Sequence, residues 1–408
     1  MDYVFEDMRR LRSVRAPLPR NSYIYFMKTI NLILILLFSF LSHCLNAQYY
    51  FPEKNAEWQY ITVNETGLNQ SNIDKAIQFA MENEYAGPKD LRQAILKGFE
   101  YEPFHEILGP TKKRGGPAGM ILHKGYLVAS WGDIDRVDMT FSVTKSYLST
   151  VAGLALQNDL IDDLNSPVGQ QVWDSHFDGA HNSKITWHHL LTQSSDWTGQ
   201  LWGGYDWADR PPKTGNIDDW KMRQLNEPGT VFEYNDVRVN LLAYALLQVW
   251  RKPLPMVLKE NIMDPIGAST TWRWFGYDNS WTNVDGVQMQ SVSGGGHSGG
   301  GMFINTQDQA RFGLLFLNKG KWKDEQLLDP SWIDKITQPS SANPNYGYMW
   351  WLNKKGERHM DKIGEHIFYA AGFGGNYIVI DQEKDLVIVT RWLEPRKLEQ
   401  FLEVLYKR

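Results

Sequence analysis

The chain has 408 residues, a length typical of two or three packed lobes, so a small scaffold held together by disulfides is excluded. Hydrophobic residues make up 42% and charged residues 22%, and 17 Trp, 19 Tyr and 18 Phe are too many for a disordered chain. Lys and Arg number 42 against 47 Asp and Glu, the net charge is −5, and no long basic run follows residue 30. Nucleic acid is therefore not an expected partner.

The N-terminal region carries an apolar run at residues 30–45, which is shorter than the ~20 residues that a membrane-spanning helix needs. No stable membrane span is therefore expected. Lys28 precedes the run and Ala47 follows it, a pattern typical of a signal peptide cleaved before Gln48. We expect residues 1–47 to be leader and signal peptide, with Met27 preferred as the true start over a long basic leader. The protein would then be periplasmic or secreted.

Cys44 is the only cysteine, and it lies inside the predicted signal peptide. The mature chain would therefore contain no disulfide, no cysteine nucleophile and no thiolate metal site. A lipoprotein anchored through Cys44 is the less favoured alternative, because a bulky His43 precedes the cysteine. The histidines lack ligand spacing such as H-E-x-x-H, so no metal and no other cofactor is expected.

The predicted elements of the first part begin with a helix over 71–82, where apolar residues recur at helical spacing. Two short strands at 120–122 and 127–129 flank a glycine turn, and a third strand is expected near Met139. A strongly helical segment follows over 143–157. A hairpin therefore precedes a helix that begins just after Ser142.

The rest of the chain divides into a mixed segment and a second run of strands and helices. Residues 158–290 mix helices with loops rich in Trp, Asp, Gly and Pro, which indicates an inserted all-helical domain. A helix over 308–318, strands at 377–380 and 386–389, and a closing helix from residue 397 are expected after that segment. The prediction is an α/β (α+β) domain built from 48–157 and 291–408, interrupted by the helical domain 158–290.

Ser142 and Lys145 stand three residues apart at the start of the predicted helix, so their side chains share one face. The N-terminus of a helix offers free N–H groups and a positive dipole end, which stabilise an oxyanion. Burial there should push the pKa of Lys145 below ~10.4, toward that of a usable base. The pair could form an activated serine nucleophile, but such a pair also occurs by chance, so the motif alone does not decide.

A second candidate nucleophile is Ser298, in Gly296-His297-Ser298-Gly299-Gly300, which fits the G-x-S-x-G elbow of α/β hydrolases. That elbow needs a buried strand before it and a helix directly after it. Residues 288–293 are too polar for a central strand, so a loop of closely approaching backbone is the favoured interpretation. An α/β-hydrolase-type esterase using Ser298 stays open as an alternative.

Taken together, the motifs resemble the serine β-lactamase and penicillin-binding protein superfamily in its class C and esterase-like branch. The chain is similar there to secreted hydrolases grouped with aminohexanoate-oligomer hydrolases. Besides Ser142-x-x-Lys145, the resemblance rests on segments that occur in the family's order: Leu160–Leu164 with Pro167-Val168, Ile185–Ser195, Pro228-Gly229-Thr230 leading into Tyr234, Asp264–Gly267, Gly299–Gly301 with Asp308-x-x-Arg311-Phe312-Gly313, and Gly372-Phe373-Gly374-Gly375.

The resemblance implies a β-lactamase/transpeptidase-like fold, with an antiparallel sheet flanked by helices, a helical domain and a cleft between them. Ser142 would be the acylated nucleophile, Lys145 its proton acceptor, and Tyr234 a second base that protonates the leaving group and activates water. The oxyanion hole would combine the amide of Ser142 with one at Phe373. We expect a serine hydrolase acting on small-molecule esters or amides; a non-catalytic penicillin-fold binding protein is the alternative.

Three departures from the family pattern stand out. Asp236 ends the second motif where Asn or Ser is usual, and Gln193 and Asp196 stand where His and Gly are common. The third motif has two registers: residues 370–372 (Ala-Ala-Gly) lack its cation, whereas His366 would supply one through a longer loop. The first register is preferred because it places Gly372, which has no side chain, at the position where a side chain would block the substrate.

These departures bear on which substrates the site accepts. An ionised Asp236 would repel a substrate carboxylate, so β-lactams are expected to be poor substrates. The aromatic cluster of Trp197, Trp202, Tyr205 and Trp207 either lines the cleft or fills a core, and a core position is favoured for any one of them.

Overall fold

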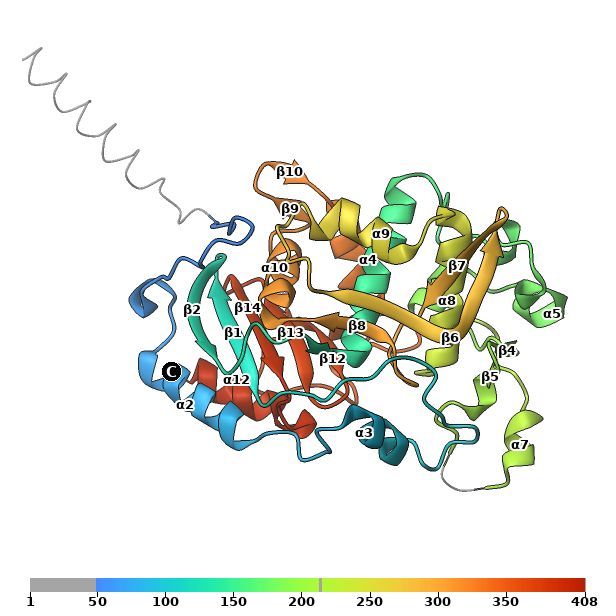
Figure 1. Cartoon of the computed structure of the whole chain (residues 1–408), viewed down its shortest axis with the longest axis horizontal. Helices are drawn as coiled ribbons and strands as arrows, with labels where there is room; N and C mark the ends of the chain where they lie inside the picture. Colours follow the sequence, from blue (N-terminus) through green and yellow to red (C-terminus); the bar gives the residue numbers. More distant parts are fainter. Residues whose placement is uncertain (1–48, 213–214, 408) are drawn as a thin grey trace, which may run out of the picture. The chain divides into compact units, whose positions relative to one another are not determined.

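The protein is described from a computed structural model, which covers residues 49–212 and 215–407. The predicted signal peptide, its cleavage after Ala47 and the possible lipid anchor at Cys44 lie outside these residues. The centre of the fold is an antiparallel six-stranded sheet in the order β11-β12-β13-β14-β1-β2 (Figure 1). Its strands are β1 (Ala118–His123), β2 (Tyr126–Trp131), β11 (Trp351–Leu352), β12 (Phe368–Gly372), β13 (Asn376–Asp381) and β14 (Leu386–Arg391).

Helices cover both faces of this sheet. On one face α2 (Gln70–Glu82) packs with α12 (Leu398–Tyr406), and α10 (Thr306–Leu317) packs on the other (Figure 1). Alternate residues of β1 face the two layers: Ile121 joins the apolar cluster under α2 and α12, while Met120 and Leu122 join the cluster under α10. Burial on both faces explains the nearly continuous apolar runs of the strands.

The helices expected around the sheet are present, with boundaries that shift by one or two residues. α2 begins at Gln70 because Asn69 caps it, its side chain accepting from the amide of Asn72. α10 begins at Thr306 because Asn305 caps it in the same way. The predicted mixed fold with an antiparallel sheet flanked by helices is confirmed.

A second sheet, in the order β3-β8-β6-β7, corrects the prediction for the middle of the chain. Its strands are β3 (Asp138–Met139), β8 (Gly301–Ile304), β6 (Arg273–Val284) and β7 (Val287–Val292). β6 and most of β7 fall inside the segment expected to be all-helical, so that expectation is wrong for residues 273–290. β7 pairs only with β6, and an edge strand tolerates polar residues such as Gln288 that a central strand excludes.

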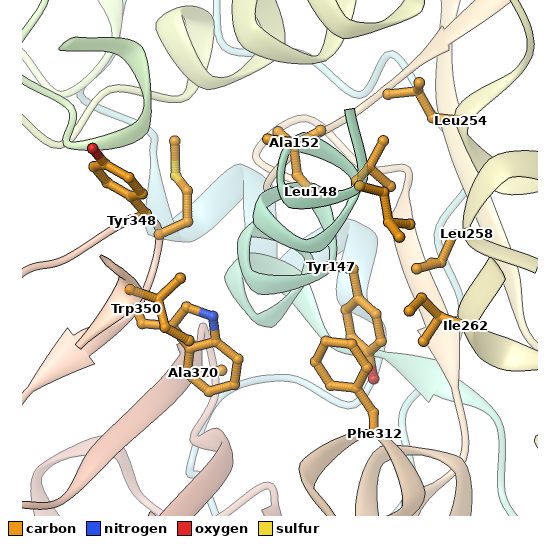
Figure 2. Packing of buried hydrophobic residues seen from close by; sticks show 14 of the residues in the cluster. Tyr147, Leu148, Ala152, Leu254, Leu258, Ile262, Phe312, Tyr348, Trp350 and Ala370 are labelled. Atoms are coloured by element: carbon orange, nitrogen blue, oxygen red, sulfur yellow. The ribbon is translucent and has the colours of Figure 1, made fainter. Parts of the chain in front are cut away.

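Among the remaining elements, α4 (Thr144–Gln157) is a helix buried almost along its whole length. Figure 2 shows Tyr147, Leu148 and Ala152 of α4 among apolar side chains of neighbouring elements. A helix that is buried almost along its whole length is held firmly, and so are the residues at its start. The others are α3 (Leu91–Gly98), α5 (Gly179–Asn182), α6 (Trp187–Leu191), α7 (Ile217–Lys221), α8 (Asp236–Trp250), α9 (Leu254–Leu258), α11 (Pro330–Ile336), β4 (Gln200–Leu201), β5 (Gly204–Tyr205), β9 (Lys321–Trp322) and β10 (Glu325–Gln326).

Across residues 49–212 and 215–407, no helix combines the length and the apolar character that crossing a bilayer requires.

Candidate active site

Ser142 lies in a short 3₁₀ turn, Phe141–Val143, directly before α4. The backbone of Phe141 has a φ of 49°, a conformation that costs energy for any residue with a side chain and that often marks a functional turn. Ser142 is partly exposed between two buried neighbours. The Nζ atom of Lys145 donates to Ser142 Oγ at 2.9 Å, so the structure forms the contact that the three-residue spacing predicts.

Lys145 also contacts Asp236, the residue that departs from the family's second motif. The Lys145 Nζ and Asp236 Oδ1 atoms are 2.5 Å apart, and both side chains are almost fully buried. Burial, the largest single effect, lowers the pKa of Lys145, but the Asp236 carboxylate and Tyr234 together outweigh it, and the pKa lies above its usual 10.5. The expectation of a lowered Lys145 pKa is therefore wrong, and Lys145 is an ammonium group.

Asp236 is placed by the start of α8. Asn235 caps this helix by accepting from the amide of Arg238, and the amide of Asp236 donates to a carboxylate oxygen of Asp209. Burial would raise the pKa of Asp236, but Lys145 and Arg210 hold it well below its usual 3.8. The carboxylate is therefore ionised and compensated by two cations.

Tyr234 lies beside the same two cations. Its ring centroid is 4.7 Å from Lys145 Nζ and 5.2 Å from Arg210 Cζ, and the ring stacks on Trp351 at 5.8 Å. The three residues assigned catalytic roles from the resemblance, Ser142, Lys145 and Tyr234, therefore converge. Two cations therefore lie over the Tyr234 ring.

The end of β12 approaches the nucleophile closely. A Cβ atom on Gly372 would lie 2.1 Å from the carbonyl oxygen of Thr140 and 3.3 Å from the amide nitrogen of Ser142, so only glycine fits there. Phe373 follows directly, and its ring packs at 5.0 Å on Phe141, the residue before the nucleophile. The structure thus places Gly372 and Phe373 beside Ser142, as the preferred register of the third motif requires.

The alternative register is wrong. His366 lies beyond the opposite end of β12 from Gly372, with its Nε2 atom 2.8 Å from Asp381 Oδ1 and its Nδ1 atom 3.2 Å from Glu383 Oε2. Ala370, where the family's third motif has its cation, is buried in the core with Trp350 nearby (Figure 2). The β12 strand therefore contributes glycine and backbone to the site but no basic side chain.

Ser298 does not occupy a nucleophile elbow. It lies in the loop between β7 and β8 and is followed by a strand, because the next element is Gly301–Ile304 rather than a helix. Its amide donates to the Tyr277 hydroxyl at 3.3 Å, and its carbonyl accepts from Leu108 and Gly109. The α/β-hydrolase interpretation is thereby overturned. The backbone of this loop instead hydrogen-bonds to the backbone of Leu108 and Gly109.

Four residues missed by the sequence analysis surround Asp236. Arg210 places Nη2 at 2.6 Å from Asp236 Oδ2 and Nη1 at 2.6 Å from Asp209 Oδ1. Arg210 Nη2 also lies 3.0 Å from His297 Nδ1, and His297 Nε2 lies 2.6 Å from Glu102 Oε2. Because guanidinium only donates, His297 Nδ1 is the acceptor and Nε2 carries the proton toward Glu102. We call Glu102, Asp209, Arg210 and His297 the Arg210 network.

Part of this network has the composition of a metal site. Glu102, Asp209 and His297 each offer a ligand atom, and these atoms lie within 4.8 Å of one another. The guanidinium of Arg210, however, already bonds to both Asp209 and His297, so positive charge is supplied from within the chain. We interpret the network as a set of charges that holds Asp236 in place.

Gln193 and Asp196, the other two departures from the family pattern, form hydrogen bonds near the Tyr234 segment. Gln193 accepts from the amide of Asn235 at 3.0 Å and donates to the hydroxyl of Tyr346 at 2.8 Å. Asp196 has a φ of 44°, which explains why glycine suits this position, and Asp is among the residues that tolerate it. Its carboxylate accepts from Arg223 and Arg238, so both replacements add bonds around the Tyr234 segment.

The sequence model of the β-lactamase family matches residues 114–391, more than half of the chain. A family VIII carboxylesterase has a similar structure, with a TM-score of 0.55 at 16% identity over 86% of this chain and 100% of that one. A Bacillus anthracis protein assigned as a 6-aminohexanoate-dimer hydrolase gives 0.52 at 16% identity over 86% of each chain. The N-acetylmuramyl-L-alanine amidase of Bacillus subtilis (strain 168) is 24% identical over 200 residues, which are 40% of this chain and 44% of that protein. The chain thus spans less than half the length of this relative. Because the family model covers more than half of the chain and the fold is β-lactamase/transpeptidase-like, the chain belongs to the β-lactamase family of hydrolases.

Proposed function

We propose that the protein is a serine hydrolase that cleaves small esters or amides through an acyl-enzyme. The observation that carries this proposal is the position of Lys145 Nζ, which contacts Ser142 Oγ at 2.9 Å and Asp236 at 2.5 Å beside the ring of Tyr234. The relatives named above include an amidase and a carboxylesterase, both of which cleave acyl bonds. A non-catalytic binding protein would not need these polar side chains to converge on a partly exposed serine.

The structure suggests a division of roles in acylation. Ser142 Oγ forms a bond to the substrate carbonyl carbon, and the hydroxyl proton passes to Tyr234, whose anion lies beside Lys145 and Arg210. Lys145 remains charged, and its hydrogen bond orients Oγ and stabilises negative charge on it. The amides of Ser142 and Phe373 receive the substrate oxyanion. Tyr234 then returns the proton to the leaving alcohol or amine.

Deacylation repeats the sequence with water. Tyr234 accepts a proton from a water molecule that attacks the acyl carbon, the bond to Ser142 Oγ breaks, and the proton returns to Oγ as the acid leaves. A serine-reactive phosphonate tests the proposal directly, because the adduct should map by peptide mass analysis to the peptide that holds Ser142. An adduct on Ser298, with none on Ser142, would contradict it.

Small neutral esters should be hydrolysed at least about tenfold better, in kcat/KM, than the β-lactam nitrocefin. A carboxylate beside the reacting carbonyl gains roughly 1.5 to 3 kcal/mol from a charged partner, and Ala370 provides none. Lys145 and Arg210 are already paired with carboxylates. The measurement compares nitrocefin with a short-chain nitrophenyl ester and a short aminoacyl amide, with Ser142→Ala as the blank. Faster nitrocefin turnover would contradict this and identify Arg210 as an available carboxylate partner.

We also propose that the protein is exported after cleavage between Ala47 and Gln48. The apolar run at 30–45 is too short to span a bilayer and ends near the small residue that a signal peptidase prefers. N-terminal mapping of protein recovered from outside the cytoplasm should give Gln48 as the first residue. A lipid-modified Cys44 at the N-terminus would refute this, and so would a chain that keeps residues 28–47.

A further inference from the structure

A pocket with a cavity volume of about 80 Å³ opens next to the catalytic cluster, and Asp236 and His297 form part of its wall. That volume is well below the roughly 300–1,000 Å³ of a whole small-molecule site, so the pocket can hold only a small arm of a substrate. Much of the remaining wall is apolar or aromatic, with contributions from Leu108, Leu201, Trp202, Tyr205, Val237 and Tyr277. Because Asp236 bonds to Lys145, a group held in this pocket lies close to the carbonyl that Ser142 would attack.

The rim of the pocket carries three aromatic rings that pack on one another. The centroid of Phe104 is 6.0 Å from that of Tyr205 and 6.1 Å from that of Trp207, and Tyr205 and Trp207 are 5.4 Å apart. Phe104 is 68% exposed and has a φ of 60°. Packing on these two rings leaves most of the Phe104 side chain exposed on a strained backbone, which favours a role in binding.

The position of these rings answers the question raised by the aromatic cluster in the sequence. Trp197 is 1% exposed and belongs to the core, whereas Trp202 and Tyr205 line the pocket. Trp207 supports Tyr205 and Phe104 from the side. Two of the four aromatic residues thus face a space that a ligand can enter.

The carboxylates around the pocket already have hydrogen-bond partners within the protein. Glu102 accepts from His297 Nε2 and from the amide of Arg210, Asp209 pairs with Arg210, and Asp236 pairs with both Lys145 and Arg210. A charged ligand group entering beside them would lose its hydration and find each of these buried carboxylates already hydrogen-bonded. The exposed Glu106 at the mouth remains in contact with water. The pocket therefore favours an uncharged ligand.

We propose that this pocket binds an uncharged aromatic arm of the substrate, which packs against Phe104 and Tyr205. The inference rests on the proposed function, because it assigns a substrate class to the same site. Aromatic pairs contribute beyond the area they bury, so the rim discriminates between aryl and short alkyl substrates. The arm belongs to the alcohol or to the acyl part of the ester, and substrates that vary one part at a time distinguish the two.

The first test compares kcat/KM for the hydrolysis of ethyl acetate, benzyl acetate and ethyl phenylacetate, measured by the release of acid. The wild-type protein should prefer one of the two aromatic esters over ethyl acetate, and Phe104→Ala/Tyr205→Ala should reduce that preference by about tenfold. The matched control is Trp173→Ala, since Trp173 is also exposed, at 88%, but does not line the pocket. Its preference should equal that of the wild type. An unchanged preference in the double variant would overturn the inference.

A binding measurement separates this inference from the proposed function. Calorimetry on Ser142→Ala should show that neutral phenylacetamide binds, and that adding Phe104→Ala/Tyr205→Ala weakens binding by about tenfold. Tighter binding of benzylammonium or phenylacetate than of phenylacetamide would overturn the assignment of a neutral ligand. Phenylacetamide binding without any turnover by the wild type would reject the hydrolase and keep the pocket. Ester turnover by the wild type without phenylacetamide binding would keep the hydrolase and reject the aromatic pocket.

Discussion

Ser142→Ala should lower kcat for a short-chain nitrophenyl ester by on the order of 10⁴-fold or more, while the Tm changes little. The variant removes the nucleophile, and without it only the oxyanion donors and the binding surface remain. The stability effect is small because Ser142 is partly exposed and its hydroxyl makes one hydrogen bond, to Lys145. Steady-state kinetics and thermal unfolding of both proteins provide the measurement.

Two matched variants show whether the loss is specific. Ser298→Ala should keep most of the activity, because Ser298 lines the pocket but makes its contacts through its backbone amide and carbonyl. Tyr234→Phe should lose most of the activity and little stability, since groups that act as one unit fail together. Lys145→Ala is a poorer control, because it leaves the buried Asp236 carboxylate without one of its partners. Wild-type-like turnover by Ser142→Ala would exclude Ser142 as the nucleophile, and a wild type with neither turnover nor adduct would favour the binding protein.

Most of the α/β fold was predictable because local patterns determine its elements. The short apolar run Met120–Leu122 before a glycine turn identifies β1, and helical spacing identifies α2 and α10. The β6–β7 hairpin was missed because β7 lies at the edge of its sheet and the outer part of β6 pairs with β7 alone, so these residues need no apolar face and resemble those of a loop. Whether a strand lies at an edge depends on its neighbours in the sheet, which are distant in sequence.

The candidate site likewise contains contacts that local sequence patterns predict and contacts between residues far apart in the sequence. Ser142 and Lys145 are three residues apart on one helix, so their contact follows from helix geometry. The Arg210 network, by contrast, joins Glu102, Arg210 and His297, with 195 positions between Glu102 and His297 and 87 between Arg210 and His297. No local pattern marks such residues. His297 was visible in the glycine-rich loop, but only as a neighbour of Ser298.

The protonation of Lys145 shows how a single contact reverses a prediction from sequence. Burial at a helix N-terminus argues for a lowered pKa, and burial does act in that direction. The sign of the net shift depends on the 2.5 Å contact with Asp236, which lies 91 positions away. The departure at Asp236 was recognised as a barrier to anionic substrates, whereas its main structural role is to keep Lys145 and Arg210 charged.

Asp236→Asn should destabilise the protein by about 3 to 5 kcal/mol near neutral pH, because it leaves Lys145 as a buried cation without its carboxylate. The folded-state pKa of Asp236 is lowered, so its contribution is complete above the unfolded value of ~3.9 and is lost as the pH falls below it. The pKa of Lys145 is raised, so its contribution is present below ~10.4 and is lost as the pH rises through the folded value. The difference in free energy of unfolding should therefore be nearly constant from about pH 5 up to the pH at which Lys145 of the variant loses its proton, and should decrease above that pH.

The pH dependence of kcat/KM in the same variant separates the two possible roles of Lys145. Without the carboxylate, burial and Arg210 lower the Lys145 pKa and only Tyr234 opposes them, so the alkaline limb of the profile should move to lower pH if the ammonium is the active form. If neutral Lys145 were the proton acceptor, Asp236→Asn would instead gain activity between about pH 7 and 9. Asp308→Asn is the matched control, because it replaces a largely buried carboxylate that bonds to Ser269, apart from the catalytic cluster. That control should lose stability but keep the wild-type profile, so a shift confined to Asp236→Asn reports on the charge of Lys145 rather than on a weakened fold.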